Sequence, residues 1–275
     1  MSKLEGGKLN QLGRLLPEGL LVDAAWLEAH GYSRALRSQY VSSGWLDSPV
    51  RGVYWRPRGV SRWEQVVISL QVLLGYPVSV GGRTALEMRG YSHYLYQEQQ
   101  AVHLYSDRKL PSWLSKLPDM PAFIMHNRSR FLPALPGYSD KLTLDPAVAS
   151  PRLPGALDID AWGPWGWPLV CSAPERAILE LIDELPRGIS FDMVDKFMEG
   201  LVTLRPRKMQ SLLEEAKSVK VKRLFLFFAD RHCHQWLDMI ERSKIDLGKG
   251  KRMIARGGKL DRTYQITVPE DMDAL

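Results

Sequence analysis

The stretch "YSRALRSQYVSSGWLDSPVRGVYWRP", residues 32–57, decides the fold of the N-terminal part of the chain. Ser33 can cap a helix over residues 34–42, because a serine hydroxyl at this position accepts a hydrogen bond from a free backbone N–H group. After Gly44 the segment predicts two strands joined by a turn at residues 47–49, where Asp, Ser and Pro favour a change of direction. The stretch therefore predicts a helix followed by a β-hairpin.

Two shorter helices are expected before this stretch. Residues 8–16 place four leucines on one face, and Pro17 stops the helix. Residues 22–30 follow, with Asp23 as the N-cap and Gly31 at the C-terminal end. Three helices followed by a hairpin are the order of a winged helix-turn-helix.

The remaining sequence predicts a larger domain that mixes helices and strands. Amphipathic helices are expected at residues 61–75 and 173–186, whereas "AVHLYS", "AFIMHN" and "LTLDPA" have the pattern of strands. Further helices are expected at residues 81–90, 190–200, 206–217 and 220–241. We therefore predict an α+β fold, with a winged helix-turn-helix domain over residues 1–95 and a larger mixed α+β domain over residues 96–275.

Composition limits the class of protein. The chain has 275 residues, of which 45% are hydrophobic and 25% charged, as in ordinary globular proteins. It has no apolar run of about 18 residues and no signal-peptide core near its start, so we expect a cytoplasmic protein that does not contact a membrane. Cys171 and Cys233 are too few for a disulfide framework.

The net charge of +6 is unevenly distributed along the chain. Residues 1–95 carry 11 Lys and Arg against 7 Asp and Glu, and residues 200–275 carry 16 against 10. Residues 96–199 carry 10 against 14. Basic ends around an acidic centre indicate an anionic partner that meets the ends, and nucleic acid is the commonest such partner.

The predicted third helix offers a candidate DNA-binding face. Leu36 and Tyr40 lie four residues apart, so they can pack onto the preceding helix. Arg34, Arg37 and Ser38 are expected together on another face, where arginine can contact guanine edges or phosphate oxygens. The hairpin adds further cations that a wing would bring to phosphates: Arg51, Arg56 and Arg58. The alternatives are a solvated helix face and a module that binds protein.

No catalytic or metal-binding constellation is predicted. His232, Cys233 and His234 are consecutive, so on a helix their side chains diverge by about 100° and do not close around one ion. The segment "GKGKR" does not complete a phosphate-binding P-loop pattern. The sequence places no nucleophile near His93, His103 or His126. Asp158 and Asp160 could coordinate Mg²⁺ from one face of a strand, but such a pair is too common to indicate a site. We therefore expect no catalytic residue, no metal and no cofactor, and a protein that is not an enzyme.

Several ordered blocks carry a resemblance to one family. They are "YVSSGWLDSPVRGVYWRPRG", "VGGRTALEMRGYSHYL", "CSAPERAILELI", "EGLVTLRPRKMQSLLEEAKSVKVKRLFLFFADR" and "LGKGKRMIARGGKLDRTYQITVPED". From about residue 8 to residue 270 the sequence resembles the AbiEi antitoxins of bacterial abortive-infection toxin–antitoxin pairs. The resemblance implies an N-terminal winged helix that represses its own promoter by binding inverted repeats in double-stranded DNA, with monomers pairing on the DNA. It also implies a C-terminal domain that counteracts a nucleotidyltransferase-like toxin without a stable complex, the type IV arrangement.

The residues predicted for these two roles follow from the same blocks and from the charge pattern. The DNA-binding set comprises Ser33, Arg34, Arg37, Ser38, Tyr40, Arg51, Arg56 and Arg58. The antitoxic role is assigned to a basic surface comprising Lys220, Lys222, Arg223, Lys249, Lys251, Arg252 and Lys259. Two other functions stay open, a nucleic-acid-processing enzyme and an RNA-binding module that uses the basic C-terminal domain.

Overall fold

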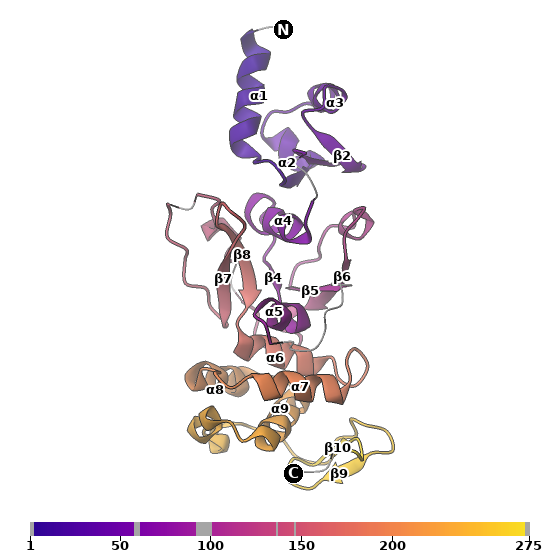
Figure 1. Cartoon of the computed structure of the whole chain (residues 1–275), viewed down its shortest axis with the longest axis vertical. Coiled ribbons are helices and arrows are strands. Elements are labelled where there is room, and N and C mark those ends of the chain that lie inside the picture. The colour runs from indigo at the N-terminus through magenta and orange to yellow at the C-terminus, as the bar shows by residue number, and fades with distance from the viewer. Residues whose placement is uncertain (1–2, 58–60, 92–100, 136, 146, 273–275) are drawn as a thin grey trace.

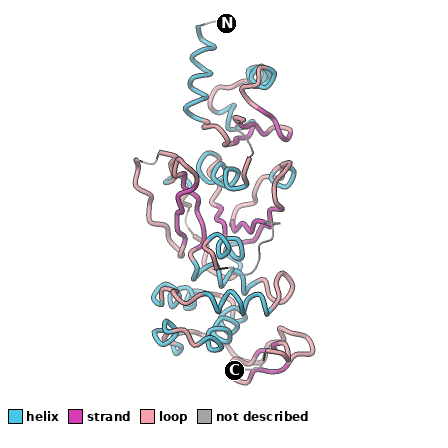
Figure 2. The backbone as a smooth tube through the Cα atoms, viewed as in Figure 1, coloured by secondary structure: helices cyan, strands magenta, loops and turns pink. Residues whose placement is uncertain are grey.

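The computed structural model describes residues 3–57, 61–91, 101–135, 137–145 and 147–272. Its elements are stacked along one long axis, from the N-terminus at one end to a small hairpin at the other (Figure 1). A mixed sheet lies between the N-terminal unit and a layer of helices (Figure 2). This arrangement confirms the predicted α+β fold class.

The N-terminal unit has the topology of a winged helix-turn-helix. Its elements are α1 (Lys3–Leu15), β1 (Leu21–Asp23), α2 (Ala24–Ala29), α3 (Arg34–Ser42), β2 (Asp47–Val50) and β3 (Val53–Trp55). The three strands form an antiparallel sheet in the order β1-β3-β2. The bounds of α3 are those predicted, and the hydroxyl of Ser33 caps it by accepting a hydrogen bond from the backbone N–H of Leu36.

Two local predictions in this unit are wrong. Residues 21–23 form a strand rather than the start of a helix, and Asp23 caps the shorter α2 that follows. The hairpin turns at Arg51 and Gly52 rather than at residues 47–49, which lie within β2. Gly52 has a φ of +81°, a left-handed conformation that glycine adopts without the strain of a Cβ atom. The turn therefore falls at the one glycine of the hairpin, next to Arg51.

A five-stranded mixed sheet forms the middle of the molecule. Its strands are β4 (Val78–Val80), β5 (Ala101–Ser106), β6 (Ala122–Asn127), β7 (Leu157–Trp162) and β8 (Trp167–Ser172). They are ordered β6-β5-β4-β8-β7. Strand β5 is parallel to β6 and antiparallel to β4, and β4 is parallel to β8. The central strand, β4, precedes the predicted domain boundary at residue 95, and the other four strands follow it. The sheet therefore contains residues from both sides of that boundary.

The sheet lies between two large hydrophobic cores, and three helical segments from residues 61–91 cover it. They are α4 (Trp63–Ile68), a π-helical turn that continues it (Ser69–Leu73), and α5 (Gly82–Met88). Val102 and Leu104 of β5 belong to the core shared with the winged helix. Since side chains alternate along a strand, His103 and Tyr105 point to the opposite face, toward the helical layer.

Four helices form that layer. They are α6 (Pro174–Asp183), α7 (Phe191–Gly200), α8 (Pro206–Glu215) and α9 (Val219–His232). Pro174 occupies the first turn of α6, where a missing backbone N–H group costs no hydrogen bond. Residues 175–182 are all buried, so α6 is the central helix of the second core. The predicted helix over residues 220–241 ends instead at His232, and Cys233 caps it in a left-handed conformation with a φ of +47°.

The C-terminal part consists of loops, short 3-10 turns and a hairpin. The hairpin pairs β9 (Lys259–Asp261) with β10 (Ile266–Val268) in antiparallel orientation. Among the residues that the structure describes, the 3-10 turns are Leu114–Lys116, Arg128–Arg130, Ser139–Lys141, Gln235–Met239 and Arg242–Lys244. The segment "LTLDPA" forms no strand in its described residues, which is a correction to the prediction.

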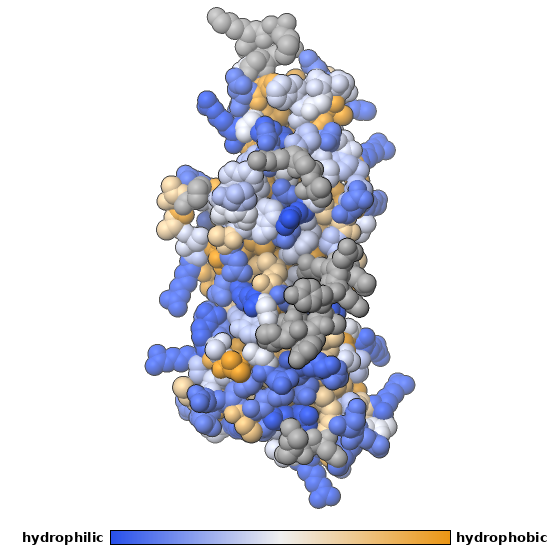
Figure 3. Space-filling view, viewed as in Figure 1, coloured by the Kyte–Doolittle hydropathy of each residue, from blue (hydrophilic) through white to orange (hydrophobic). Residues whose placement is uncertain are grey.

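The face of the molecule drawn in Figure 3 is largely hydrophilic. Figure 3 shows one face, where hydrophobic side chains are scattered among hydrophilic ones. Within the described part of the chain, no helix combines the length and the apolar character that crossing a membrane requires.

Candidate nucleic-acid interface and a histidine–glutamate cluster

The first turns of α3 are open to solvent. Ser33, Arg34 and Ser38 are exposed. Tyr40 is buried, and its ring centroid lies 6.3 Å from that of Tyr32. Tyr40 therefore anchors α3 in the core of the winged helix, and its predicted contact with DNA is corrected.

Arg37 points into the protein rather than onto the exposed face of α3. Its side chain is 6% exposed and donates hydrogen bonds from Nη1 to the backbone oxygens of Tyr32 (2.8 Å) and Ala24 (3.3 Å). Its guanidinium carbon lies 6.0 Å from the ring centroid of Tyr54 on β3. Position 37 lies about 60° around the helix from both Arg34 and Tyr40, so the sequence period does not decide its side. The prediction that it faces DNA is wrong.

Replacing Arg37 by alanine should lower the free energy of unfolding by about 2 kcal/mol, because two buried carbonyl oxygens would lose a charged donor. Urea unfolding followed by circular dichroism would measure the change. Arg34→Ala, three residues earlier on the exposed face, is the matched control and should change stability by no more than about 0.5 kcal/mol. Equal effects of the two changes would contradict the inward role of Arg37.

The wing carries one exposed arginine at its tip. Arg51 lies in the turn and is exposed. Arg56, also predicted to meet phosphates, instead donates hydrogen bonds to the backbone oxygens of Gly13 (3.1 Å) and Leu16 (3.0 Å) and pairs with Glu18 at 3.2 Å. It therefore joins β3 to the end of α1, which is a correction. Arg58 lies outside the described residues.

Some residues of the predicted basic surface of the C-terminal domain are buried. Lys222 and Arg223 are 5% and 3% exposed, so their assignment to it is wrong. Arg223 donates to the backbone oxygens of Leu247 (2.7 Å), Gly250 (2.7 Å) and Gln265 (3.3 Å), and thus fastens the C-terminal loops to α9. Burial and the nearby Arg252 lower the pKa of the Arg223 guanidinium.

The other members of this set divide into two groups. Lys220 is half-buried, and its ammonium donates to the backbone oxygens of Asp183 (2.6 Å) and Leu185 (3.0 Å). Burial lowers the pKa of this ammonium, while the Asp183 carboxylate acts in the opposite direction. The exposed members are Lys249, Lys251, Arg252 and Lys259. The exposed part of the predicted surface thus lies on the C-terminal loops and β9.

The carboxylates of β7 are held by cations from other elements. Arg89 Nη2 lies 3.0 Å from Asp160 and 3.7 Å from Asp158. Arg205 and Lys208 reach Asp158 from α8, at 3.4 Å and 3.5 Å. The pair is thus part of an ion-pair network between the sheet and the helices.

His232 at the end of α9 and His234 just beyond it have separate partners. Nε2 of His232 lies 3.0 Å from the carboxylate of Asp195, and Nε2 of His234 lies 2.8 Å from the backbone oxygen of Met198. Burial opposes ionisation of Asp195, but hydrogen bonds from His232 and Arg231 outweigh it and lower the pKa of this carboxyl. These side chains link α9 to α7.

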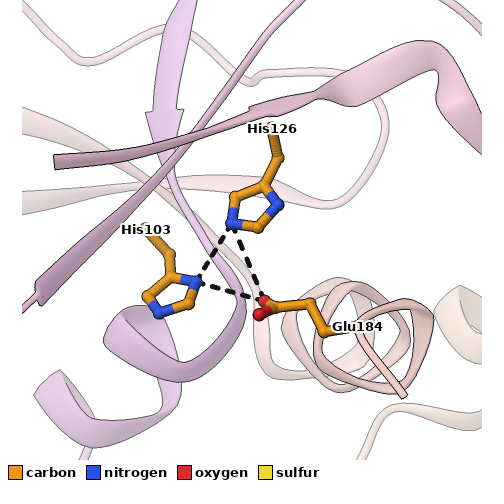
Figure 4. Close-up of side chains that lie close together, drawn as sticks. All are labelled: His103, His126 and Glu184. Atoms are coloured by element: carbon orange, nitrogen blue, oxygen red, sulfur yellow. Dashed lines mark hydrogen bonds and ion pairs between the residues drawn. The ribbon is translucent and has the colours of Figure 1, made fainter. Parts of the chain in front are cut away.

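Three side chains that are far apart in the sequence meet at one point of the structure, and no sequence signal connects them. His103 of β5, His126 of β6 and Glu184 at the end of α6 face one another (Figure 4). Nδ1 of His103 lies 3.1 Å from Nε2 of His126 and 3.1 Å from a carboxylate oxygen of Glu184. Nε2 of His126 lies 3.8 Å from the same oxygen.

The sheet register explains why the two histidines meet. β5 and β6 are parallel neighbours, and Tyr105 is paired with His126. His103 is two residues before Tyr105, so both histidines point to the same face of the sheet. The ring of Tyr105 stacks on His126 at 4.5 Å, and its hydroxyl donates to Glu184 at 3.3 Å. The alternating pattern of each strand was visible in the sequence, but their parallel pairing was not.

Burial and neighbouring charges shift the pKa values of this cluster. Burial lowers the pKa of His126, against the opposite effect of Glu184. Burial opposes ionisation of Glu184, but the hydrogen bond from His103 and the charges of both histidines lower its pKa overall. Burial, followed by the charges of Glu180 and Glu184, raises the pKa of Tyr105 well above its usual value. The cluster therefore places two imidazoles beside an ionised carboxylate and a phenolic donor.

The cluster lies in a cleft between the sheet and the helical layer. The cleft has a volume of about 1630 Å³ and is lined by β5, β6, the end of α6 and the C-terminal loops. Its cationic lining residues are Arg83, Arg130, Arg187, Lys220 and Arg256. Arg130 pairs with Asp183 at 3.3 Å, and Arg83 pairs with Glu87 at 2.6 Å. The cleft can thus admit a polar or anionic ligand to the histidines.

Comparisons with known proteins agree with the resemblance seen in the sequence. Residues 5–97 match a family described as "Transcriptional regulator, AbiEi antitoxin N-terminal domain", and residues 99–269 match "Transcriptional regulator, AbiEi antitoxin, Type IV TA system". The comparison with curated proteins finds no match. The crystal structure of the RV2827C protein from Mycobacterium tuberculosis is similar in fold, with a TM-score of 0.56 and 15% identity over 97% of this chain and 91% of that chain. Because the two family matches span nearly all of the sequence, the chain belongs to the AbiEi family of antitoxin transcriptional regulators of type IV toxin–antitoxin systems.

Proposed function

We propose that this protein is a transcriptional autorepressor that binds inverted repeats in its own promoter through α3 and the wing. The observation that carries the proposal is the exposed start of α3, where Ser33, Arg34 and Ser38 are open to solvent. Arg37 and Tyr40, in contrast, are buried and hold the helix against the rest of the unit. Membership of a family of transcriptional regulators supports DNA as the ligand.

The geometry of the exposed residues fits a major groove. Arg34 and Ser38 lie one turn apart, so their side chains share a face. The N-terminal residues of the second helix of a helix-turn-helix contact base edges, and arginine pairs best with guanine. Arg51 at the tip of the wing is placed to contact a phosphate. One chain contacts one half-site, so an inverted repeat would take two copies.

We propose further that the C-terminal domain counteracts a nucleotidyltransferase-like toxin without forming a stable complex with it. The exposed lysines and arginines of the C-terminal loops, Lys249, Lys251, Arg252 and Lys259, are the part of the predicted basic surface that supports this role. In this proposal the protein acts by binding rather than by catalysis, and it acts in the cytoplasm, where its promoter lies.

Replacing Arg34 by alanine should weaken binding to the DNA upstream of the reading frame by about 1–3 kcal/mol and reduce selectivity for one base position. Arg51→Ala should weaken binding equally on all sequences and reduce the slope of log affinity against log salt by about 1, because it removes one phosphate contact. Fluorescence anisotropy over a range of salt, on promoter and random duplexes, would measure both effects.

The control is Arg207→Ala, an exposed arginine of α8 that lies in the helical layer, far from the wing. It should leave both affinity and salt slope unchanged. If Arg34→Ala binds the promoter as tightly and as selectively as the unaltered protein, α3 does not contact the bases. Promoter affinity no better than that for random DNA would overturn the autorepressor proposal itself.

A further inference from the structure

We propose that His103, His126 and Glu184 bind a zinc ion and leave one coordination position open to the cleft. The inference concerns the middle of the molecule and is independent of whether α3 binds DNA. It rests on the convergence of three ligand atoms, on the hydrogen bonds that these atoms can and cannot make, and on the residues that hold them.

The spacing of the ligand atoms fits a zinc ion. Zinc binds imidazole nitrogen and carboxylate oxygen at about 2.0–2.2 Å, so two ligand atoms of a tetrahedral site lie about 3.3 Å apart. The three separations here are 3.1 Å, 3.1 Å and 3.8 Å. A small movement of the Glu184 side chain would make them equal.

Hydrogen bonds serve these three atoms poorly, because one proton must be shared between two acceptors. Nδ1 of His103 is close to both Nε2 of His126 and the oxygen of Glu184, yet it carries one proton at most. If Nδ1 donates that proton to the carboxylate, Nε2 of His126 can accept only a share of the same hydrogen bond, or else points its own N–H group at the N–H group of His103. If Nδ1 has no proton, its lone pair faces a negatively charged oxygen. A cation between them accepts all three lone pairs at once.

The supporting residues hold the ligands in place. The hydroxyl of Tyr105 donates to Glu184, and its ring stacks on His126. The backbone N–H of His103 donates to the hydroxyl of Thr84 at 2.9 Å, which fixes this part of β5 against α5. Partners of this kind orient metal ligands and increase metal affinity. Two ligands stand on neighbouring strands and one at the end of a buried helix, so the site is built on rigid elements.

The ligand types select among metals. Two imidazoles and one carboxylate suit zinc, whereas magnesium and calcium prefer oxygen ligands and more of them. Three protein ligands leave a fourth position, and here it faces a cleft that is also lined by Arg130, Lys220 and Arg256. A water molecule or an anionic oxygen can complete the coordination.

Isothermal titration of the full chain with zinc chloride, after chelator treatment, tests the site. We expect one zinc ion per chain and no heat with magnesium chloride. His126→Ala, chosen because this side chain is 22% exposed on an edge strand, should weaken binding by about 100-fold or more. Glu184→Gln keeps the shape of the side chain and should also weaken binding strongly, and Tyr105→Phe should weaken it by about tenfold.

Two control variants make the result decisive. His30→Ala removes a histidine of the winged helix and should leave zinc binding unchanged. The double variant His232→Ala, His234→Ala tests the other histidine pair and should also bind zinc normally. The proposal fails if the protein binds no zinc, if binding survives in both His126→Ala and Glu184→Gln, or if it is lost in the double variant instead. Circular dichroism of each metal-free variant would show that it is folded, so that a loss of binding reports on the site.

Discussion

Replacing Glu180 by alanine should lower the free energy of unfolding by about 3–5 kcal/mol, because it leaves the guanidinium of Arg176 buried without its counter-ion. The side chains of Arg176 and Glu180 are 1% and 0% exposed, and Nε of Arg176 lies 2.7 Å from a Glu180 oxygen. Nη1 of Arg176 donates to the backbone oxygen of Gly155 at 2.9 Å, whereas Nη2 has no hydrogen-bond partner among the described residues. Removing the carboxylate would therefore leave a charge in the core with one remaining acceptor.

Glu180 also joins the helical layer to the sheet. Its second oxygen accepts a hydrogen bond from the backbone N–H of Gly82 at 2.9 Å, at the start of α5. A Cβ atom on Gly81 would lie 2.3 Å from that oxygen and 2.5 Å from the ring of Tyr105, so the three elements approach as closely as glycine allows. Replacing Glu180 should therefore also disturb the zinc site, since the positions of Tyr105 and Glu184 depend on this contact between α5, β5 and α6.

The measurement is urea unfolding of the full chain, with Asp192→Ala as the matched control. Asp192 also forms an (i, i+4) pair, with Lys196 at 2.9 Å, but these two side chains are 72% and 59% exposed. Exposed pairs contribute little, so this change should alter stability by no more than about 0.5 kcal/mol. If Glu180→Ala costs no more than Asp192→Ala, burial of the pair has no bearing on stability and the argument fails.

Local sequence signals determined α3 well but not the direction of each side chain on it. Ser33 as cap and the apolar spacing of Leu36 and Tyr40 gave the bounds of the helix. Arg37 was placed wrongly because its position lies between the two faces. The acceptors that draw it inward, the backbone oxygens of Ala24 and Tyr32, belong to the preceding helix and the turn, and only the tertiary structure brings them there.

The histidine–glutamate cluster shows the same limit at longer range. The strands 101–106 and 122–127 were predicted from their alternating pattern, and that pattern already fixes which residues share a face of each strand. It does not show that β5 and β6 are parallel neighbours, nor that α6 ends above them. Glu184 is 58 residues from His126, and no local signal connects the two.

Arg223→Ala should lower the free energy of unfolding by about 3 kcal/mol, since hydrogen bonds to charged groups contribute about 1.5–3 kcal/mol each when buried. In the sequence this arginine lies in "VKVKRLFLFF", and its charge predicts a place on a basic surface. In the structure it is the donor for three backbone oxygens of the C-terminal loops, at Leu247, Gly250 and Gln265. The change should also free these loops, so limited proteolysis should cut them faster than the rest of the chain. Lys251→Ala, an exposed cation on the same loops, is the control and should alter neither property. Equal free energies of unfolding and equal rates of cleavage for the two variants would contradict this role of Arg223.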